Sequence, residues 1–197
     1  MIKLIIFDVG GVIDTFDEKY YIRYICRKLK IDQKEFKEAL IPLLDKMEVS
    51  KISLDEMLYR LSQRFNISKE KLEWGSAFSK LNCVNTNVVK LMARLSKHYN
   101  IAILTNVSRS RHEMKMGRYL EKVKYDRIFA SCYLKMNKPH AKIYRFVLKK
   151  MKVKANEAIF IDNLERNVAG ARKVGIKSIQ FKGYAQLAHS LKKIGIE

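Results

Sequence analysis

Three short apolar runs of the sequence end in polar side chains that carry oxygen atoms. The residues at these run ends are Asp8, Thr105, Asn106, Asp162 and Asn163. Carboxylate and amide oxygens are the ligands that Mg²⁺ prefers in proteins. A carboxylate can also attack phosphorus and form an aspartyl-phosphate, which splits a hydrolysis into two steps. The residue types therefore indicate a metal site combined with a carboxylate nucleophile.

Three further residues extend this set toward a phosphate-binding site. Gly10 and Gly11 follow Asp8 closely, and glycine lets backbone N–H groups approach an anion. Lys138, which precedes Pro139, adds a positive charge that could offset the charge on a transferring phosphoryl group. These residues lie far apart in the sequence, so the fold must bring them together.

The predicted order of helices and strands explains how they could meet. Apolar runs predict strands at 2–7, 101–105, within 127–134, at 158–162 and at 176–181. Helical stripes lie between them, so the sequence predicts an α/β fold, a Rossmann-like three-layer core with helices on both faces of a parallel sheet. Ligands of such sheets bind outside the carboxyl ends of the strands. We therefore expect the polar residues at the run ends to converge there.

Residues 16–82 interrupt this alternation and predict helices without a strand. Asp32 and Ser53 each stand three residues before a glutamate, in the form of a capping box at a helix start. This segment has 14 Lys and Arg residues against 11 Asp and Glu residues. It is therefore predicted to be a small helical block with a balanced charge.

Four motifs in order resemble those of the haloacid dehalogenase (HAD) superfamily. Residues 7–12 (Phe-Asp-Val-Gly-Gly-Val) resemble the first motif, and residues 103–106 (Ile-Leu-Thr-Asn) resemble the second. Asn-Lys-Pro at 137–139, with Ile-Tyr at 143–144, resembles the third. Phe-Ile-Asp-Asn at 160–163, with Asn-Val-Ala-Gly-Ala at 167–171, resembles the fourth. The resemblance covers nearly the whole chain.

The resemblance implies a HAD-like core domain, formed by residues 1–15 and 83–197, and an inserted helical cap domain, residues 16–82. Caps of this kind close over the site, exclude water and select the substrate. The implied function is a Mg²⁺-dependent phosphohydrolase that acts on a small phosphorylated metabolite, such as a sugar phosphate. The implied partner is thus a small-molecule phosphate ester.

The resemblance also assigns a role to each candidate residue. The catalytic residues would be Asp8, as the nucleophile, and Lys138, which would balance charge between Asp8 and the phosphoryl group. Substrate binding would fall to Gly10, Gly11, Thr105 and Asn106. The metal would be held by Asp8, the backbone carbonyl of Gly10, Asp162 and Asn163.

Two positions depart from the pattern of the family's phosphatases. Where they have an aspartate that acts as general acid and base, this chain has Gly10, which cannot transfer a proton. General acid–base catalysis typically contributes about 10² to 10⁴ in rate, so the reaction should be slower unless another group replaces it. Asn163 stands where an aspartate is commoner, and its neutral amide should bind Mg²⁺ more weakly.

Two alternative functions follow from these departures and from the charge. A 2-haloacid dehalogenase of the same superfamily also lacks the second aspartate of the first motif, but it needs no metal and its fourth motif differs. A HAD-like protein with weakened catalysis could instead bind a polyanion or nucleic acid through its basic surface. The net charge is +20, and residues 109–154 hold 15 Lys and Arg residues against three Asp and Glu residues.

Composition indicates where the protein works. Cys26, Cys83 and Cys132 fit neither a zinc site nor a disulfide framework, so they are predicted to be reduced thiols. The first apolar run is too short for a signal peptide or a membrane span. We therefore expect a cytoplasmic protein with no membrane partner.

Overall fold

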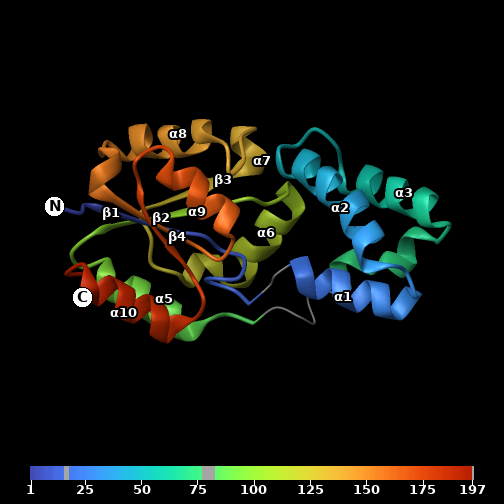
Figure 1. Cartoon of the computed structure of the whole chain (residues 1–197), viewed down its shortest axis with the longest axis horizontal. Coiled ribbons are helices and arrows are strands. Elements are labelled where there is room, and N and C mark those ends of the chain that lie inside the picture. Colours follow the sequence, from blue (N-terminus) through green and yellow to red (C-terminus); the bar gives the residue numbers. More distant parts are fainter. Residues whose placement is uncertain (16–17, 77–82, 197) are drawn as a thin grey trace.

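The computed structural model describes residues 1–15, 18–76 and 83–196. Its centre is a five-stranded, all-parallel sheet in the order β3-β2-β1-β4-β5, with helices above and below (Figure 1). The strands are β1 Leu4–Phe7, β2 Asn100–Thr105, β3 Arg127–Ala130, β4 Ala158–Asp162 and β5 Lys177–Gln180. The predicted three-layer α/β core is confirmed.

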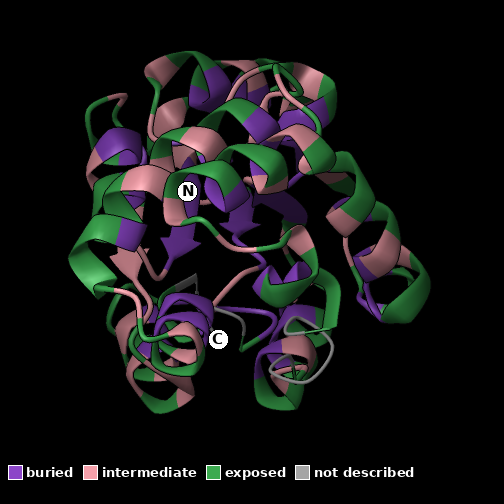
Figure 2. Ribbon diagram, turned by 90° about the vertical axis from the view of Figure 1, so that its right-hand side faces the viewer, coloured by how far each residue is buried: buried purple, intermediate pink, exposed green. Residues whose placement is uncertain are grey.

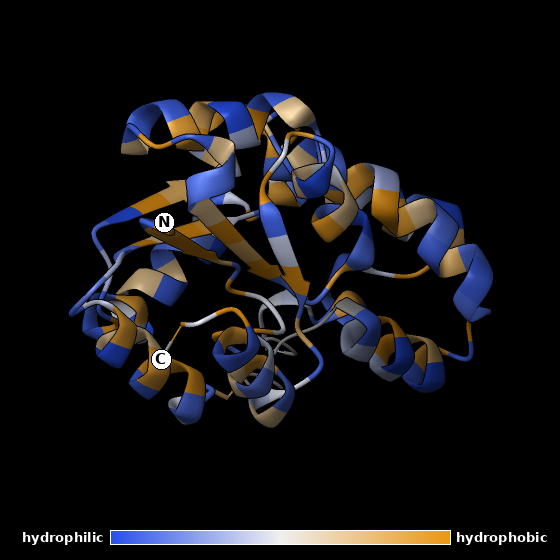
Figure 3. Ribbon diagram, turned by 60° about the vertical axis from the view of Figure 1, so that its left-hand side comes forward, coloured by the Kyte–Doolittle hydropathy of each residue, from blue (hydrophilic) through white to orange (hydrophobic). Residues whose placement is uncertain are grey.

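The central strand shows why the sheet needs helices on both faces. All four side chains of β1 are fully buried, and successive side chains of a strand point to opposite faces. Leu4 and Ile6 belong to the apolar cluster that includes α8 (Ala141–Met151), while Ile5 and Phe7 belong to the cluster on the other face. Hydrophobic strands therefore lie between two covering layers (Figure 3).

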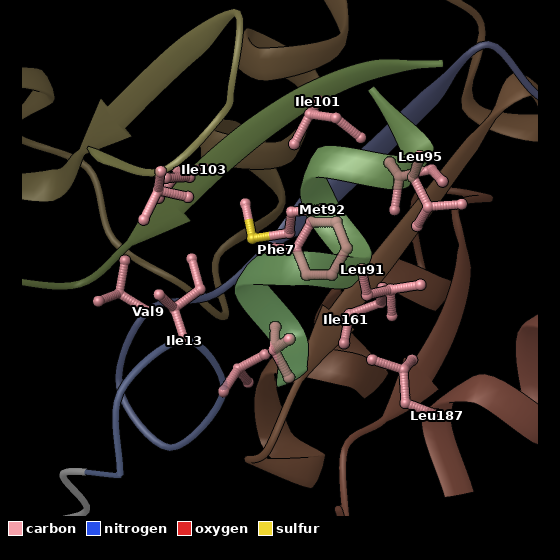
Figure 4. Packing of buried hydrophobic residues seen from close by; sticks show 14 of the residues in the cluster. Phe7, Val9, Ile13, Leu91, Met92, Leu95, Ile101, Ile103, Ile161 and Leu187 are labelled. Atoms are coloured by element: carbon pink, nitrogen blue, oxygen red, sulfur yellow. The ribbon is translucent and has the colours of Figure 1, made fainter. Parts of the chain in front are cut away.

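The face that receives Phe7 is covered by two helices from distant parts of the chain. Leu91 and Met92 of α5 (Thr86–Leu95) pack around Phe7 and Ile161, and Leu187 of α10 (Tyr184–Lys193) lies beside them (Figure 4). All five side chains are at most 3% exposed. This packing fixes the end of β1, which is the point where Asp8 leaves the sheet.

The remaining elements of the core connect these layers. They are α6 Arg109–Arg118, η2 Leu120–Lys122, α7 Ser131–Leu134, η3 Ala155–Glu157 and α9 Glu165–Arg172. The segment predicted to contain one strand holds both β3 and the one-turn helix α7, since four residues are too few to show a helical period. No helix among the described residues is long and apolar enough to cross a membrane.

Between β1 and α5 the described residues form a helical block with its own apolar core. Its elements are α1 Glu18–Leu29, α2 Gln33–Glu48, α3 Leu54–Phe65 and η1 Lys69–Leu72. Tyr21 and Trp74 meet edge to face at its centre, with ring centroids 4.6 Å apart. Asp32 and Ser53 cap α2 and α3 through their side-chain oxygens, as predicted. Buried and exposed residues alternate along the helices of the molecule (Figure 2), as expected for helices that each cover an apolar core with one face.

The end of α2 brings the block against the sheet domain. Ser131 Oγ donates to the backbone carbonyl of Glu48 at 2.7 Å, and Ser50 Oγ donates to that of Cys132 at 3.0 Å. Met114 of α6 also packs against the apolar core of the block. The block in Figure 1 is therefore docked on the core through α2, α6 and α7, so Glu48 is held beside the strand ends.

Candidate active site

The carboxyl ends of three neighbouring strands carry the predicted polar residues. Asp8 directly follows β1, Thr105 ends β2 and Asp162 ends β4. The backbone N–H of Asp8 donates to the carbonyl of Ile161 at 2.9 Å, so Asp8 continues the ladder with β4. All three polar side chains are at most 6% exposed. Convergence at the strand ends, expected from the sequence, is observed.

Lys138 lies between the two carboxylates of this group. Its Nζ donates to Asp8 Oδ1 and to Asp162 Oδ2, each at 2.7 Å. It also lies 5.5 Å from the centroid of the Phe160 ring. The Lys138 side chain is 1% exposed. A buried charge needs such partners, because desolvation costs several kcal/mol per ion.

Two asparagines hold this network in place. The Asn106 side chain accepts from the backbone N–H of Lys138 and donates to its carbonyl, both at 2.9 Å. Asn167 Nδ2 donates to Asp162 Oδ2 at 3.0 Å, and the backbone N–H of Leu164 donates to Asp162 Oδ1 at 2.8 Å. Asp162 therefore already accepts three N–H donors, which orients it toward Lys138. Asn106 Nδ2 keeps its second hydrogen for another acceptor.

The charges of this network are not balanced, and the pKa values reflect it. Burial and the nearby Asp162 carboxylate raise the pKa of Asp8 to about 7, against the lowering effect of Lys138. Burial alone would lower the pKa of Lys138, but Asp162 and Asp8 outweigh it and raise that pKa. One buried ammonium faces two buried carboxylates. Added positive charge at this point would favour ionised Asp8.

The residues present fit a hard divalent cation. Asn163 Oδ1 is a buried oxygen without a hydrogen-bond partner among the described residues, and such an atom needs a donor or a metal ion. Asp8 and Gly10 lie beside it on the wall of the same cavity. The described residues contain no group of three or more His, Cys, Asp or Glu side chains that could hold a metal. A site here would therefore combine a carboxylate with neutral oxygens, a set that suits Mg²⁺.

Gly11 is needed for close packing beside this oxygen. Its φ of +77° is a left-handed conformation that favours glycine. A Cβ at this position would lie 2.3 Å from Asn163 Nδ2. Gly11 is not among the described residues that line the cavity, and neither is Asp162. The structure thus places Gly11 behind Asn163 and Asp162 behind Lys138.

The cavity at the strand ends has a volume of about 60 Å³, room for roughly four water molecules. Six predicted residues line it, namely Asp8, Gly10, Thr105, Asn106, Lys138 and Asn163. Its wall also includes residues that sequence reasoning did not assign to the site: Glu48, Arg111, Lys115, Leu164, Arg166 and Asn167. Leu164 is the one apolar side chain among these described residues.

Lys115 on α6 is one of the two most deeply buried additional residues, with an exposed fraction of 3% equal to that of Asn167. Its Nζ donates to Asp14 Oδ2 at 2.6 Å, and the hydroxyl of Tyr119 donates to the same carboxylate oxygen. Asp14 is 1% exposed, and its backbone pairs with Gly10. Burial lowers the pKa of Lys115, against the opposing effect of Asp14. The sequence showed only a basic stretch after Ser108, without the contact that selects Lys115.

Comparison with known proteins identifies the family. The family model for haloacid dehalogenase-like hydrolases matches residues 5–181, which is most of the chain. The chain belongs to the haloacid dehalogenase-like hydrolases. The resemblance inferred from four sequence motifs is therefore confirmed.

Two individual relatives match this HAD hydrolase over most of its length at low sequence identity. D-ribitol-5-phosphate phosphatase of Bacteroides thetaiotaomicron is 24% identical over 193 residues, which cover 91% of this chain and 92% of the relative. Drimenol cyclase drtB of Aspergillus calidoustus is 22% identical over 200 residues and 98% of this chain. The match covers 37% of drimenol cyclase, so the chain spans about a third of that relative's length.

A solved structure supports the fold of this HAD hydrolase. A HAD family enzyme of Bacteroides thetaiotaomicron, crystallised with magnesium and inorganic phosphate, superposes with a TM-score of 0.76. The superposition covers 95% of this chain and 99% of the other, with 21% sequence identity. The parallel sheet with flanking helices is thus the fold of the family.

Proposed function

We propose that this HAD hydrolase is a Mg²⁺-dependent phosphatase that cleaves a small, polar phosphate monoester through an aspartyl-phosphate on Asp8. The observation that carries the proposal is the placement of Lys138 between Asp8 and Asp162, at the carboxyl end of β1. This ammonium holds Asp8 Oδ1 and leaves Oδ2 for attack on phosphorus. D-ribitol-5-phosphate phosphatase, which matches over most of both chains, supports the same reaction class.

Each residue of the site has a defined task in this proposal. Lys138 neutralises part of the charge on Asp8 and on the incoming phosphoryl group. Thr105 and the free hydrogen of Asn106 Nδ2 would donate to the phosphoryl oxygens. Mg²⁺, held by Asp8, the carbonyl of Gly10 and Asn163, would offset the remaining negative charge. Asp162 supports the site through its hydrogen bonds to Lys138 and Asn167.

The nature of the cavity wall favours a hydroxylated substrate. Leu164 is the one apolar side chain among the described residues of the wall, while Glu48 and Arg111 offer an acceptor and donors for hydroxyl groups. An apolar ester would place hydrocarbon against this polar wall and displace water from it, which costs free energy. We therefore propose a sugar or polyol phosphate as the substrate.

We further propose that the chain is divided as its motifs imply. Residues 1–15 and 83–197 would form the core domain, and residues 16–82 the cap that excludes water from the site. Two observations support the division among the described residues. The helical block has its own apolar cluster, and its residue Glu48 reaches the cavity wall. A cap in this position would close the cavity from the side opposite the strand ends.

The test is phosphate release from an aryl phosphate and from a panel of sugar and polyol phosphates. Each ester is assayed with Mg²⁺, with EDTA and with the Asp8→Asn variant, and unfolding curves show whether the variant is folded. We expect turnover that disappears in EDTA and in the variant. We also expect mass spectrometry of quenched wild-type protein to find one phosphoryl group on the peptide that contains Asp8. Phosphate release that survives Asp8→Asn would overturn the proposal.

The two alternative functions are separated by the same protein preparation. A 2-haloacid dehalogenase would release halide from 2-haloacids in EDTA, because that reaction needs no metal. A nucleic-acid-binding function would give a salt-dependent shift of DNA or RNA that Asp8→Asn leaves unchanged. The basic segment 109–154 supports the second alternative only through its charge.

A further inference from the structure

The cavity contains a second buried lysine that the reaction described above leaves without a task. Lys115 is 3% exposed and lies on the cavity wall together with Asp8 and Gly10. A charged side chain buried in this way is costly unless it is paired, and Asp14 supplies the pair. An apolar residue of similar volume would often serve stability equally well. The position of Lys115 therefore calls for a functional explanation.

The proposed reaction lacks a source for one proton. When the bond between phosphorus and an alkyl ester oxygen breaks, that oxygen leaves as a strongly basic alkoxide unless it receives a proton. Gly10 has no side chain that could supply it. A proton donor for the leaving group must therefore be found elsewhere on the cavity wall.

Most charged groups of the wall are poor candidates for this task. The guanidinium groups of Arg111 and Arg166 do not give up a proton in proteins. Lys138 donates to two carboxylates, and these stabilise its charged form against loss of a proton. Glu48 is a carboxylate, which accepts protons when ionised. Lys115 is the remaining acidic N–H donor among the charged residues described on this wall.

The surroundings of Lys115 hold its ammonium close to the position that lacks an acid. Asp14 accepts from Lys115 Nζ at 2.6 Å and from the hydroxyl of Tyr119. The backbone of Asp14 pairs with Gly10, and the N–H of Asp14 donates to the carbonyl of Val9 at 3.0 Å. The carboxylate of this ion pair thus belongs to the loop that follows Asp8, and it holds the Lys115 ammonium near that loop.

We propose that Lys115 is a catalytic residue that protonates the leaving oxygen of the substrate and so replaces the acid missing at Gly10; this rests on the phosphatase function proposed above. In the first step Asp8 forms a bond to phosphorus, the ester P–O bond breaks, and a proton moves from Lys115 Nζ to the departing oxygen. In the second step neutral Lys115 takes a proton from water, whose oxygen attacks phosphorus. Asp8 is released, and the net reaction consumes one water.

The test uses two leaving groups of different basicity. 4-Nitrophenolate leaves without a proton, whereas an alkyl alcohol needs one. The assay compares kcat/KM for 4-nitrophenyl phosphate with kcat/KM for the alkyl phosphate that the wild type cleaves fastest. This parameter reports the steps through release of the alcohol. For Lys115→Met we expect a loss of about 10² to 10⁴ on the alkyl ester and less than about tenfold on the aryl ester.

Matched variants separate proton transfer from charge and from structure. Arg118→Met removes an exposed basic residue from the same helix and should leave kcat/KM for both esters unchanged. Lys115→Arg keeps the charge but cannot donate a proton at neutral pH, so its kcat/KM for the alkyl ester should stay as low as that of Lys115→Met. Gly10→Asp in the Lys115→Met background should raise kcat/KM for the alkyl ester at least tenfold. Gly10, unlike Gly11, does not have a left-handed φ, so a side chain is compatible with its backbone.

Several results would overturn the role of Lys115. Equal losses on both esters, or full activity of Lys115→Arg, would show that the residue acts through structure or charge. A loss confined to the alkyl ester in Glu48→Gln and absent in Lys115→Met would assign the proton to Glu48. If Lys115→Met does not fold, the double variant Asp14→Asn with Lys115→Met removes both buried charges. The ratio of its kcat/KM values for the two esters then decides whether Lys115 transfers a proton.

The outcome also distinguishes this role from the function on which it rests. A wild type that cleaves neither ester with Mg²⁺ would overturn the phosphatase function and the role of Lys115 together. A wild type that cleaves both esters, with a Lys115→Met variant that does so equally well, would overturn only the role of Lys115.

Discussion

Two buried lysines approach the same cavity from opposite sides, and their surroundings differ. Lys138, in the loop before α8, contacts the carboxylates of Asp8 and Asp162, and these raise its pKa. Lys115, on α6, contacts the carboxylate of Asp14, and its burial lowers its pKa. The same side chain is therefore a stabilised charge in one region, and in the other it has the lowered pKa that suits the proton transfer proposed above.

The difference shows how the number of carboxylates around an ammonium divides the work of a site. Two negative partners offset more than the loss of hydration, so the proton stays on the nitrogen. One partner does not offset it fully. The reaction proposed here needs both properties, because phosphoryl transfer requires constant positive charge, whereas departure of an alcohol requires a proton.

The largest expected effect comes from removing the stabilised charge. Lys138→Met would leave two buried carboxylates facing each other without an ammonium. Breaking a buried pair in this way costs about 3 to 5 kcal/mol, and we expect the loss in urea unfolding together with at least a 10³-fold loss of kcat. Lys142→Met, an exposed position on α8, is the control and should leave both quantities unchanged. Stability equal to the wild type would contradict the network around Lys138.

Removing one of the carboxylates should have the opposite sign. With EDTA, Asp8→Asn should stabilise the protein at pH 8, because folding raises the pKa of Asp8 to about 7 and ionised Asp8 is disfavoured in the fold. The gain is up to about 4 kcal/mol, at 1.36 kcal/mol per pKa unit. Between about pH 4 and pH 7 the folded protein binds this proton more tightly than the unfolded chain does, so wild-type stability falls as pH rises. The variant should lose that part of the pH dependence, measured by urea unfolding at several pH values.

Removing Asp14, the partner of Lys115, should lower the free energy of unfolding by a smaller amount. Asp14→Asn would leave the buried ammonium of Lys115 without its carboxylate, and we expect a loss of about 3 kcal/mol in the free energy of unfolding. Adding Lys115→Met to the same chain removes the uncompensated charge and should recover most of the loss. If the double variant is less stable than Asp14→Asn alone, the two residues do not form a coupled pair.

The smallest effect concerns the neutral oxygen donor. Asn163→Asp would turn an amide oxygen into a carboxylate beside Asp8, and hard cations bind more tightly to a charged donor. We expect the Mg²⁺ concentration for half-maximal activity to fall about tenfold, which corresponds to about 1.4 kcal/mol. The measurement is a Mg²⁺ titration of phosphate release. An unchanged or higher half-maximal concentration would remove Asn163 from the proposed ligands.

The sequence was sufficient for the strand ends and insufficient for the other side of the cavity. Asp8, Thr105 and Asp162 each end a short apolar run, and parallel strands bring such ends to one edge. Lys138 was singled out by its motif, and the structure brings it into contact with Asp8. These predictions depended on local patterns that a sequence displays directly.

The contact between Lys115 and Asp14 could not be predicted in this way. The two residues are 101 positions apart and meet because α6 packs across the loop after β1. A helix of mostly polar residues gave no stripe to show which lysine turns inward. Glu48 escaped for a related reason, since its place depends on how α2 docks through Ser131 and Ser50. Long-range packing decides such positions, and sequence spacing does not display it.

The depth at which Lys138 lies depends on a residue that performs no chemistry. A Cβ on Gly170 of α9 would lie 2.4 Å from the carbonyl oxygen of Pro139, the residue after Lys138. A single added methyl group would therefore push the lysine loop away from the strand ends. In a survey of all single substitutions, Gly170 should tolerate as little change as the residues that contact the substrate. Mutational intolerance in this protein will thus mark the support of the catalytic residues as clearly as the residues themselves.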